Sequence, residues 1–328
     1  MSIVVLKFGG TSLKNIDKNS DFLKHIQNHS AKGDKIVVVV SAIGRMGEPY
    51  STDTLINQLE LIDKKIDPKK KDFIMSCGEI ISAAIVAHLL ESIGLKSEPL
   101  TGFQAGILTD NDFNTSKILE ININRIIKHI DEGKIVVVAG FQGMTKEMEI
   151  TTLGRGGSDT TAVALGAYLD ADEVYIYTDV PGVALMDPTI VPNPLYLRKI
   201  SYMDMYNLAS NGASVIHPRA VKIGMKHHIP IRILSTFNND EGTLISEEGN
   251  DNIIKGFAIK PLENKTLVSF FYNPKYYNTI MEKVIHFIKE NNKIIFKTDS
   301  NHNCIEFVVN DENVKLFGNK LYNYFLKN

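Results

Sequence analysis

The stretch KFGGTS at residues 7–12 follows an apolar run and combines a cation, two glycines and two hydroxyls. Glycines allow backbone N–H groups to approach an anion closely, and Lys7 beside Gly9 and Gly10 would neutralise negative charge that develops on a phosphate. An ordinary Gly-Gly turn at a strand end explains the same residues equally well. The GxxxxGK[ST] spacing of a Walker loop is absent. Phosphate binding and a plain turn therefore both remain open for this stretch.

The stretch TTLGRGGSDTTA at residues 151–162 carries a stronger signal. Arg155 stands between Gly154 and Gly156, and an Ala-rich helix is expected directly afterwards. We expect Ser158 or Asp159 to cap that helix, whose free N–H groups and positive dipole end favour an anion. Capping alone explains the Ser-Asp pair, but it does not explain a guanidinium flanked by glycines. The pattern favours an anion-binding role for this loop.

Glu79 lies in a helical segment whose neighbours are almost all apolar. A glutamate is seldom buried without a partner, so it either makes a structural salt bridge or awaits a cationic ligand. Cys77 beside it is interpreted as a small core residue, because no base lies near it in the sequence.

Two further stretches are ambiguous. Thr178 and Asp179 leave a strand into a Pro-Gly turn, where they either cap the turn or hold the ribose or base of a nucleotide. His217 precedes a proline in VIHPRA, and we interpret it as structural.

Apolar, β-branched runs alternate with helix-length segments and must position these side chains. The runs that predict buried strands cover residues 3–8, 35–42, 134–141, 173–178 and 229–235. The segments with helical periodicity cover roughly residues 18–32, 70–93, 115–130, 159–169 and 202–227, the last as two helices. This alternation predicts an α/β fold with a mostly parallel sheet sandwiched by helices. Ligands of such sheets bind beyond the carboxyl ends of the strands, where the residues described above stand.

The composition changes near residue 245. Residues 250–328 hold 14 asparagines, no arginine and 13 of the 27 aromatic residues, so packing there must rely on aromatic rings. Their pattern predicts strands at 265–273, 293–299 and 303–309 and helices at 276–292 and 313–326. This βαββα order indicates a small α+β domain at 246–328, after a larger domain at 1–245.

The bulk properties narrow the class of protein. The 328 residues suffice for two cores, and a net charge of −2 gives no basic field for nucleic acid or a membrane surface. Two cysteines fit a reducing cytoplasm, and strand-like sequence directly after Met1 leaves no signal peptide. The apolar run 80–90 is expected to be too short to span a bilayer. A cytoplasmic protein is predicted.

Taken together, these stretches resemble the aspartate kinases of the amino-acid kinase superfamily. The resemblance covers about 240 residues in order and spacing, through the motifs KFGGTS, VVSA, CGE, GFQG, TTLGRGGSDTTA, YTDVPGV, ASNGASVIHPRAV and STFNNDEGTLI. It implies an amino-acid kinase fold and transfer of a phosphoryl group from ATP to the side-chain carboxylate of L-aspartate. The tail resembles one regulatory ACT unit, where the family normally has two.

The resemblance also implies roles for individual residues. Lys7 and Asp159 would be catalytic, and Mg²⁺ would be carried with ATP, with no residue assigned as a metal ligand. The implied aspartate pocket contains Ser41, Thr52, Glu79, Phe141, Arg155, Gly156 and Ser158. The implied nucleotide site contains Lys7, Gly9, Gly10, Thr178, Asp179, Val183, Asp187 and Ser214.

The chain departs from the family pattern on the nucleotide side. Ala184 replaces a tyrosine, Thr189 replaces an arginine, and Ser214 replaces a lysine. Each charged hydrogen bond lost would weaken ATP binding by about 1–3 kcal/mol. Two alternatives therefore stay open: a kinase for a related acidic amino acid, and a catalytically weak paralogue with a regulatory role.

The tail departs as well. The stretch NPKYYNT at 273–279 lacks the glycine of the family's effector loop. We therefore expect reduced or no feedback regulation and a module that serves homodimerisation instead.

Overall fold

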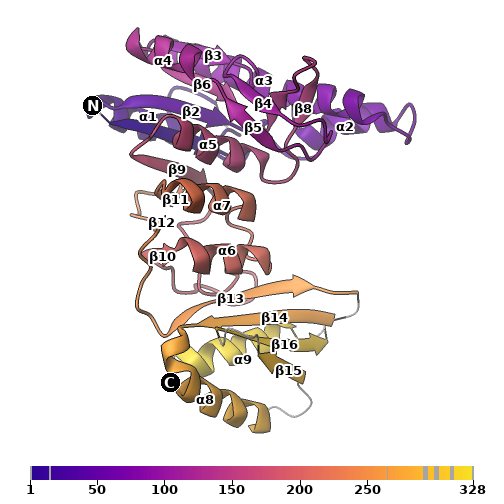
Figure 1. Cartoon of the computed structure of the whole chain (residues 1–328), viewed down its shortest axis with the longest axis vertical. Helices are drawn as coiled ribbons and strands as arrows, with labels where there is room; N and C mark the ends of the chain where they lie inside the picture. Colours follow the sequence, from indigo (N-terminus) through magenta and orange to yellow (C-terminus); the bar gives the residue numbers. More distant parts are fainter. Residues whose placement is uncertain are drawn as a thin grey trace. The chain divides into compact units, whose positions relative to one another are not determined.

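The computed structural model describes residues 2–14, 16–263, 265–290, 295–298, 303–310 and 314–326. The chain folds into two compact units, of which the first comprises Met1–Pro181 and Arg219–Glu241 and the second Gly182–Pro218 and Gly242–Asn328 (Figure 1). The domain boundary expected after residue 245 stays a prediction.

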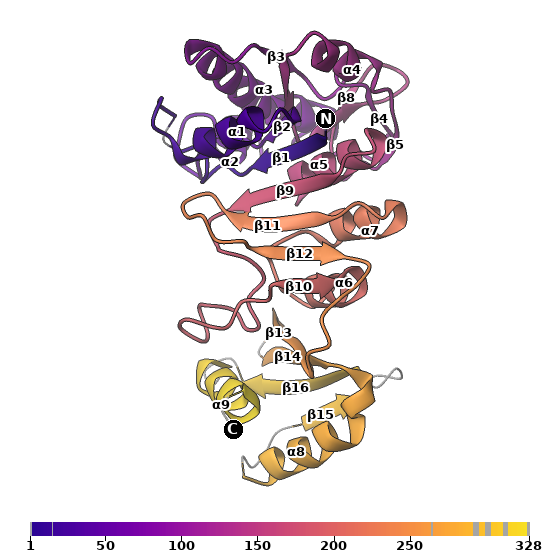
Figure 2. The ribbon, with the colours of Figure 1, turned by 90° about the vertical axis from the view of Figure 1, so that its left-hand side faces the viewer.

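A parallel sheet forms the centre of the first unit (Figure 2). Its strand order is β11 (Ile231–Ser235), β9 (Glu173–Thr178), β1 (Ile3–Phe8), β2 (Lys35–Val40), β6 (Ile135–Ala139) and β3 (Ser97–Leu100). All five neighbouring pairs are parallel. These pairings confirm the predicted mostly parallel sheet. The prediction rested on continuously apolar strands, which need helices on both faces.

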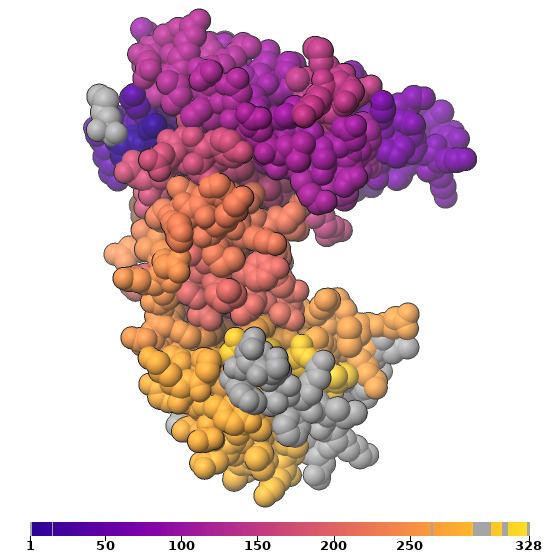
Figure 3. Space-filling model, viewed as in Figure 1, coloured from indigo at the N-terminus to yellow at the C-terminus, as the bar shows by residue number. Residues whose placement is uncertain are grey.

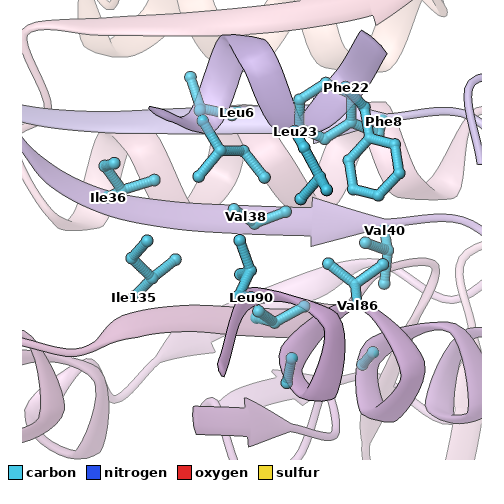
Figure 4. Close-up of a cluster of buried hydrophobic side chains, with 14 of the residues drawn as sticks. Leu6, Phe8, Phe22, Leu23, Ile36, Val38, Val40, Val86, Leu90 and Ile135 are labelled. Atoms are coloured by element: carbon cyan, nitrogen blue, oxygen red, sulfur yellow. The ribbon is translucent and has the colours of Figure 1, made fainter. Parts of the chain in front are cut away.

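Helices α1 (Asp21–Ala31) and α3 (Pro68–Ser92) cover one face of this sheet. Leu6, Phe8 and Val38 point into that core, where they meet Phe22 of α1 and Leu90 of α3 (Figure 4). Successive side chains of a strand alternate between faces, so Lys7 points to the opposite face. Helix α5 (Gly157–Tyr168) contacts β1, β9 and β2 and covers that second face.

A second, smaller sheet in this unit has the order β5 (Ile118–Ile121), β4 (Ile107–Thr109), β7 (Gln142–Met144) and β8 (Ile150–Thr152). The helix predicted over 115–130 is wrong in its first half. Residues 118–121 pair with β4, and α4 (Asn124–Asp131) begins only after them. Pairing at a sheet edge overrides the local helical pattern there.

Two short helices complete the first unit. Helix α2 (Thr52–Glu60) has no buried residue and projects as the violet surface at the upper right of Figure 3. Helix α7 (Pro218–His227) confirms the second half of the helical segment expected at 202–227.

Helix α3 confirms the helical segment expected at 70–93, and the apolar run 80–90 is only part of it. Asp67 caps it by accepting from the backbone N–H groups of Lys69 and Lys70, and Pro68 occupies the first turn. By length and composition alone it is the one helix in the described ranges that could cross a membrane, and half of its apolar window is buried inside the protein. It contacts β2, β3, β6 and β8, as the core helix of a globular unit does.

The second unit contains a parallel pair, β10 (Lys199–Ser201) and β12 (Thr243–Ser246), beside α6 (Tyr202–Ser210). It also contains an antiparallel sheet in the order β13 (Ile254–Pro261), β14 (Lys265–Tyr272), β16 (Cys304–Asn310) and β15 (Ile295–Thr298). Helices α8 (Tyr277–Glu290) and α9 (Val314–Leu326) accompany this sheet, with a 3₁₀ turn at Pro274–Tyr276.

The predicted α+β tail is confirmed, with β13 as an additional strand. Parts of the expected elements, at residues 291–294, 299 and 313, lie outside the described residues. Aromatic rings pack this α+β tail. The ring centroids of Phe257 and Phe270 are stacked 4.7 Å apart, and the Phe317 ring is edge-on to those of Phe287 and Phe307.

Candidate active site

A cavity of about 530 Å³ opens in the first unit, beside the carboxyl ends of β1, β2 and β6. It brings together the predicted residues Lys7, Ser41, Thr52, Glu79, Phe141, Arg155, Gly156, Ser158 and Asp159. Strand ends of a parallel sheet meet at one edge, which explains why residues from distant parts of the chain share one cavity.

Lys7 and Asp159 form an ion pair within this cavity. The Lys7 Nζ lies 2.8 Å from Asp159 Oδ1, and both side chains are largely buried. Lys7 reaches Asp159 because β1 directs it toward the face that α5 covers. The pair places one fixed positive charge and one fixed negative charge where β1 ends.

The expected cap of α5 is wrong. The N-cap is Gly156 at φ 68°, without a side-chain cap, and Ser158 and Asp159 lie in the first turn. Asp159 is engaged with Lys7 instead, and a glycine supplies the left-handed conformation at the cap position. The carboxylate still lies at the positive end of the helix dipole.

The loop that presents Arg155 is held on its backbone. Gly154 and Gly156 both have positive φ, at 71° and 68°, so the guanidinium is exposed between two left-handed residues. Arg219 of α7 donates hydrogen bonds to the carbonyl oxygens of Leu153 and Arg155, the latter at 2.8 Å. The loop is therefore anchored although the Arg155 side chain faces solvent.

Glu79 is a buried carboxylate with one free oxygen. Its side chain is almost fully buried, and Oε1 accepts the backbone N–H of Ala42 at 3.1 Å. Oε2 is buried without a hydrogen-bond partner, and no cation pairs with Glu79 among the residues that the structure describes. Burial raises the pKa of this carboxyl group to about 8, against a weaker opposing effect of the Ala42 hydrogen bond. An oxygen left unsatisfied in a cavity wall can accept from the ammonium group of a ligand.

Replacing Glu79 with glutamine is expected to change how stability depends on pH. The raised pKa means that folded wild type keeps a proton which the unfolded chain, with a pKa of about 4.3, releases. The contribution of this group to the free energy of unfolding is fully present below about pH 4.3 and is lost as the pH rises through about 8. Glu79→Gln has no titrating group at this position and therefore lacks this pH-dependent contribution. Urea unfolding at acid, neutral and alkaline pH measures the difference, with the exposed Glu91→Gln on the same helix as control. A difference between wild type and Glu79→Gln that stays constant with pH would contradict the buried titration.

Ser41, Phe141 and Thr52 contribute to the wall of the cavity. The backbone N–H of Ser41 donates to Phe8 at 3.1 Å, just after β2. Phe141 has φ 70°, with its N–H donated to Thr161 Oγ1 and its carbonyl accepting from Leu153. Such a conformation is uncommon for an aromatic residue and indicates a constrained position. Thr52 begins α2.

Gly9 and Gly10 lie next to the cavity but not in its lining. A Cβ on Gly10 would lie 2.5 Å from the carbonyl oxygen of Ala42, so this glycine lets the β1 turn pack on the loop after β2. A Cβ on Gly9 would lie 3.5 Å from Lys7 Nζ, so its backbone is adjacent to the ammonium group.

The other residues predicted for the nucleotide are divided between the units. Thr178 ends β9 in the first unit and Asp179 follows it, with its carboxylate 3.6 Å from the guanidinium of Arg45, which lines the cavity. Val183, Asp187 and Ser214 belong to the second unit. Their nucleotide roles stay predictions.

Within the second unit, two of these residues have local partners. The Val183 N–H donates to Thr243 Oγ1 at 2.8 Å. Asp187 Oδ1 accepts from the N–H and hydroxyl of Thr189, at 2.8 and 2.7 Å.

Sequence reasoning missed several residues of the site. Arg45, Ser51 and Asp53 line the cavity from the loop after β2 and the start of α2, which carry no motif. Asp72 was also missed. It lies seven residues before Glu79, a spacing that puts two carboxylates on the same face of one helix and could have been noticed in the sequence. Arg219 was noted only as part of VIHPRA, and its grip on the Arg155 loop depends on tertiary structure.

No group of three or more His, Cys, Asp or Glu side chains is arranged to hold a metal ion within the described ranges. Asp159 is the cavity carboxylate that lies beside Lys7. A metal ion bound to the phosphates of a nucleotide could be held there by its carboxylate oxygen.

Comparison with known proteins gives consistent similarities. A family model described as the amino acid kinase family matches residues 2–235. The chain is 45% identical to aspartokinase 1 of Bacillus subtilis (strain 168) over 253 residues, which are 77% of this chain and 63% of the relative. It is 36% identical to the aspartokinase of Rickettsia conorii over 309 residues, 94% of this chain and 73% of that relative.

Among solved structures, the aspartate kinase from Synechocystis superposes with a TM-score of 0.66 at 32% identity. That superposition covers 96% of this chain and 54% of the other. The chain thus spans about 63% of the length of the first curated relatives it matches.

Proposed function

This chain belongs to the aspartokinases of the amino acid kinase family, and we propose that it transfers the γ-phosphoryl group of ATP to the side-chain carboxylate of L-aspartate. The products are 4-phospho-L-aspartate and ADP. The observation that carries this proposal is the free Oε2 of buried Glu79 in the same cavity as Arg155 and the Lys7–Asp159 pair.

The charges of the cavity fit both ends of the proposed substrate. An α-amino acid presents an ammonium and a carboxylate at fixed separation. Glu79 accepts from the ammonium, and the Arg155 guanidinium grips the α-carboxylate with two parallel hydrogen bonds. The side chain of the amino acid is then directed toward the phosphoryl donor near Lys7.

The chemistry needs positioning and charge neutralisation more than proton transfer. The attacking side-chain carboxylate of L-aspartate is already ionised at neutral pH, so it needs no general base. One of its oxygens forms a bond to the γ-phosphorus while the bond to the β,γ-bridging oxygen breaks, and ADP leaves with that electron pair. Lys7 stabilises the charge that spreads over the transferred oxygens, and Asp159 holds Lys7 in place. Mg²⁺ carried with ATP would supply further charge neutralisation, and Asp159 is the carboxylate beside Lys7 that could face it.

Several finer statements belong to the same proposal. We place the enzyme in the cytoplasm, as a homodimer associated through its ACT-like tail. ATP binds weakly, because Ala184, Thr189 and Ser214 lack the groups that the family uses there. Feedback inhibition by an end product is reduced or absent, since the stretch NPKYYNT has no glycine and contains a 3₁₀ turn at Pro274–Tyr276 that leads directly into α8.

Release of ADP in the presence of Mg·ATP tests the proposal against its alternatives. The purified 328-residue chain would receive L-aspartate, D-aspartate, L-glutamate or succinate in parallel, with the Lys7→Ala variant as a blank. Release that requires L-aspartate supports the proposal. Release with a different acidic amino acid alone would move the substrate, and silence with every acceptor from a folded protein that binds ATP would favour the regulatory paralogue.

A further inference from the structure

Asp72 is a fully buried carboxylate outside the cavity, and no step of the proposed reaction uses it. It accepts from both the backbone N–H and the hydroxyl of Thr152, at 2.9 and 2.5 Å. It also accepts from the backbone N–H and the side-chain amide of Asn114, at 2.9 and 3.1 Å. Both oxygens are thus occupied by donors from two other segments, so the group joins three parts of the first unit.

The partners of Asp72 enclose the residue that precedes Arg155. Thr152 ends β8 two positions before Gly154. The Asn114 backbone also packs closely on Gly154, because a Cβ on Gly154 would lie 2.7 Å from the Asn114 carbonyl oxygen. Ser116 fixes the same place by donating its hydroxyl to the Thr152 carbonyl at 2.8 Å. The backbone entering Arg155 is therefore tied to Asp72.

Asp72 and Glu79 share one face of α3. They are seven residues apart, which is close to two helical turns and puts both side chains on the same side of the helix. One rigid helix thus carries the carboxylate for the ligand's ammonium and the carboxylate that holds the guanidinium loop.

We propose that Asp72 is a positioning residue that sets the distance between Glu79 and Arg155 and thereby selects α-amino acids by the separation of their ammonium and carboxylate. Arg219 holds the same loop through the carbonyls of Leu153 and Arg155. The loop is tied to α3 on one side and to α7 on the other. Substrate selection rests on the proposed kinase function, whereas the hold on the loop does not.

The test compares Asp72→Asn with wild type in two measurements. An asparagine keeps the shape but turns an NH₂ group toward donors, which leaves buried N–H and O–H groups unpaired. We expect KM for L-aspartate to rise by about 10- to 100-fold, with KM for ATP changed by less than about twofold. We also expect faster tryptic cleavage after Arg155, because the loop opens more often, with cleavage after the exposed Arg45 unchanged.

A milder variant guards against misfolding. Asn114 has φ 69°, which glycine adopts without strain, so Asn114→Gly removes the side-chain amide, which donates to Asp72 and to the Pro68 carbonyl, and keeps the backbone N–H that donates to Asp72. It should raise KM for L-aspartate by about threefold. Glu173→Gln serves as the matched control. It neutralises a carboxylate of the same unit, on β9, whose oxygen lies 2.6 Å from Arg232 Nε. It should leave both measurements as in wild type.

A double-mutant cycle shows whether Asp72 acts through Arg155. In the Arg155→Ala background, Asp72→Asn should lower kcat/KM for L-aspartate much less than it does in wild type. Equal losses in both backgrounds would overturn the inference, as would unchanged cleavage after Arg155 in folded Asp72→Asn. If wild type has no kinase activity but Asp72→Asn still exposes Arg155 to trypsin, the proposed function fails while the hold on the loop stands.

Discussion

Lys7→Ala is expected to lower kcat for phosphoryl transfer to L-aspartate by about 10³-fold while the fold stays intact. The Lys7 ammonium is largely buried and lies 2.8 Å from Asp159, so no solvent cation can take its place in the same geometry. Its charge matters most when negative charge spreads over the transferred phosphoryl oxygens. KM for L-aspartate should change little, because Glu79 and Arg155 remain. Coupled ADP release and circular dichroism measure the two effects.

Lys35→Ala is the matched control for this variant. Lys35 starts the neighbouring strand β2 and pairs with Asp131 at 2.9 Å on the surface, outside the cavity. Its loss should leave kcat unchanged. A Lys7→Ala protein that turns over as fast as wild type would remove the phosphate role of Lys7.

Glu79→Ala is expected to raise KM for L-aspartate by about 100-fold and KM for ATP by less than about twofold. The ammonium of the substrate would enter a buried site that has lost the carboxyl oxygens facing it, while the region around Lys7 and Asp159 is unchanged. Steady-state kinetics with each substrate varied in turn measures the two constants.

The free energy of unfolding of Glu79→Ala must be measured in parallel, since truncating a buried side chain of α3 leaves a cavity that lowers stability. Ser82→Ala, fully buried one turn further along the same helix, is a suitable control for such loosening. Equal increases in both KM values would mean that Glu79 supports the structure and does not bind the substrate.

Much of the first unit could be predicted because its signals are local. The strands at 3–8 and 173–178 match β1 and β9, since continuous β-branched runs have few other folded solutions. The parallel arrangement then brings Lys7, Glu79 and Arg155 to one cavity. Their chemical roles came from the family resemblance and from the need of a zwitterion for two opposite charges.

What the sequence could not give depends on tertiary contacts. Residues 118–121 form β5 because β4 is there to pair with them. Gly156 occupies the N-cap position of α5, and Asp159 pairs with Lys7, which is distant in sequence, instead of capping the helix. Asp72 and Arg219 reach the Arg155 loop across 80 and 64 residues of chain, distances at which no periodicity carries information.

Trapping of the acyl phosphate tests the central claim most directly. The full chain would be incubated with Mg·ATP, L-aspartate and hydroxylamine, over a wide range of ATP concentration. Aspartate hydroxamate should form in step with ADP, saturate only at high ATP, and be absent from Lys7→Ala. ADP release without hydroxamate, or no product at any ATP concentration from a folded protein, would contradict phosphoryl transfer to the side-chain carboxylate.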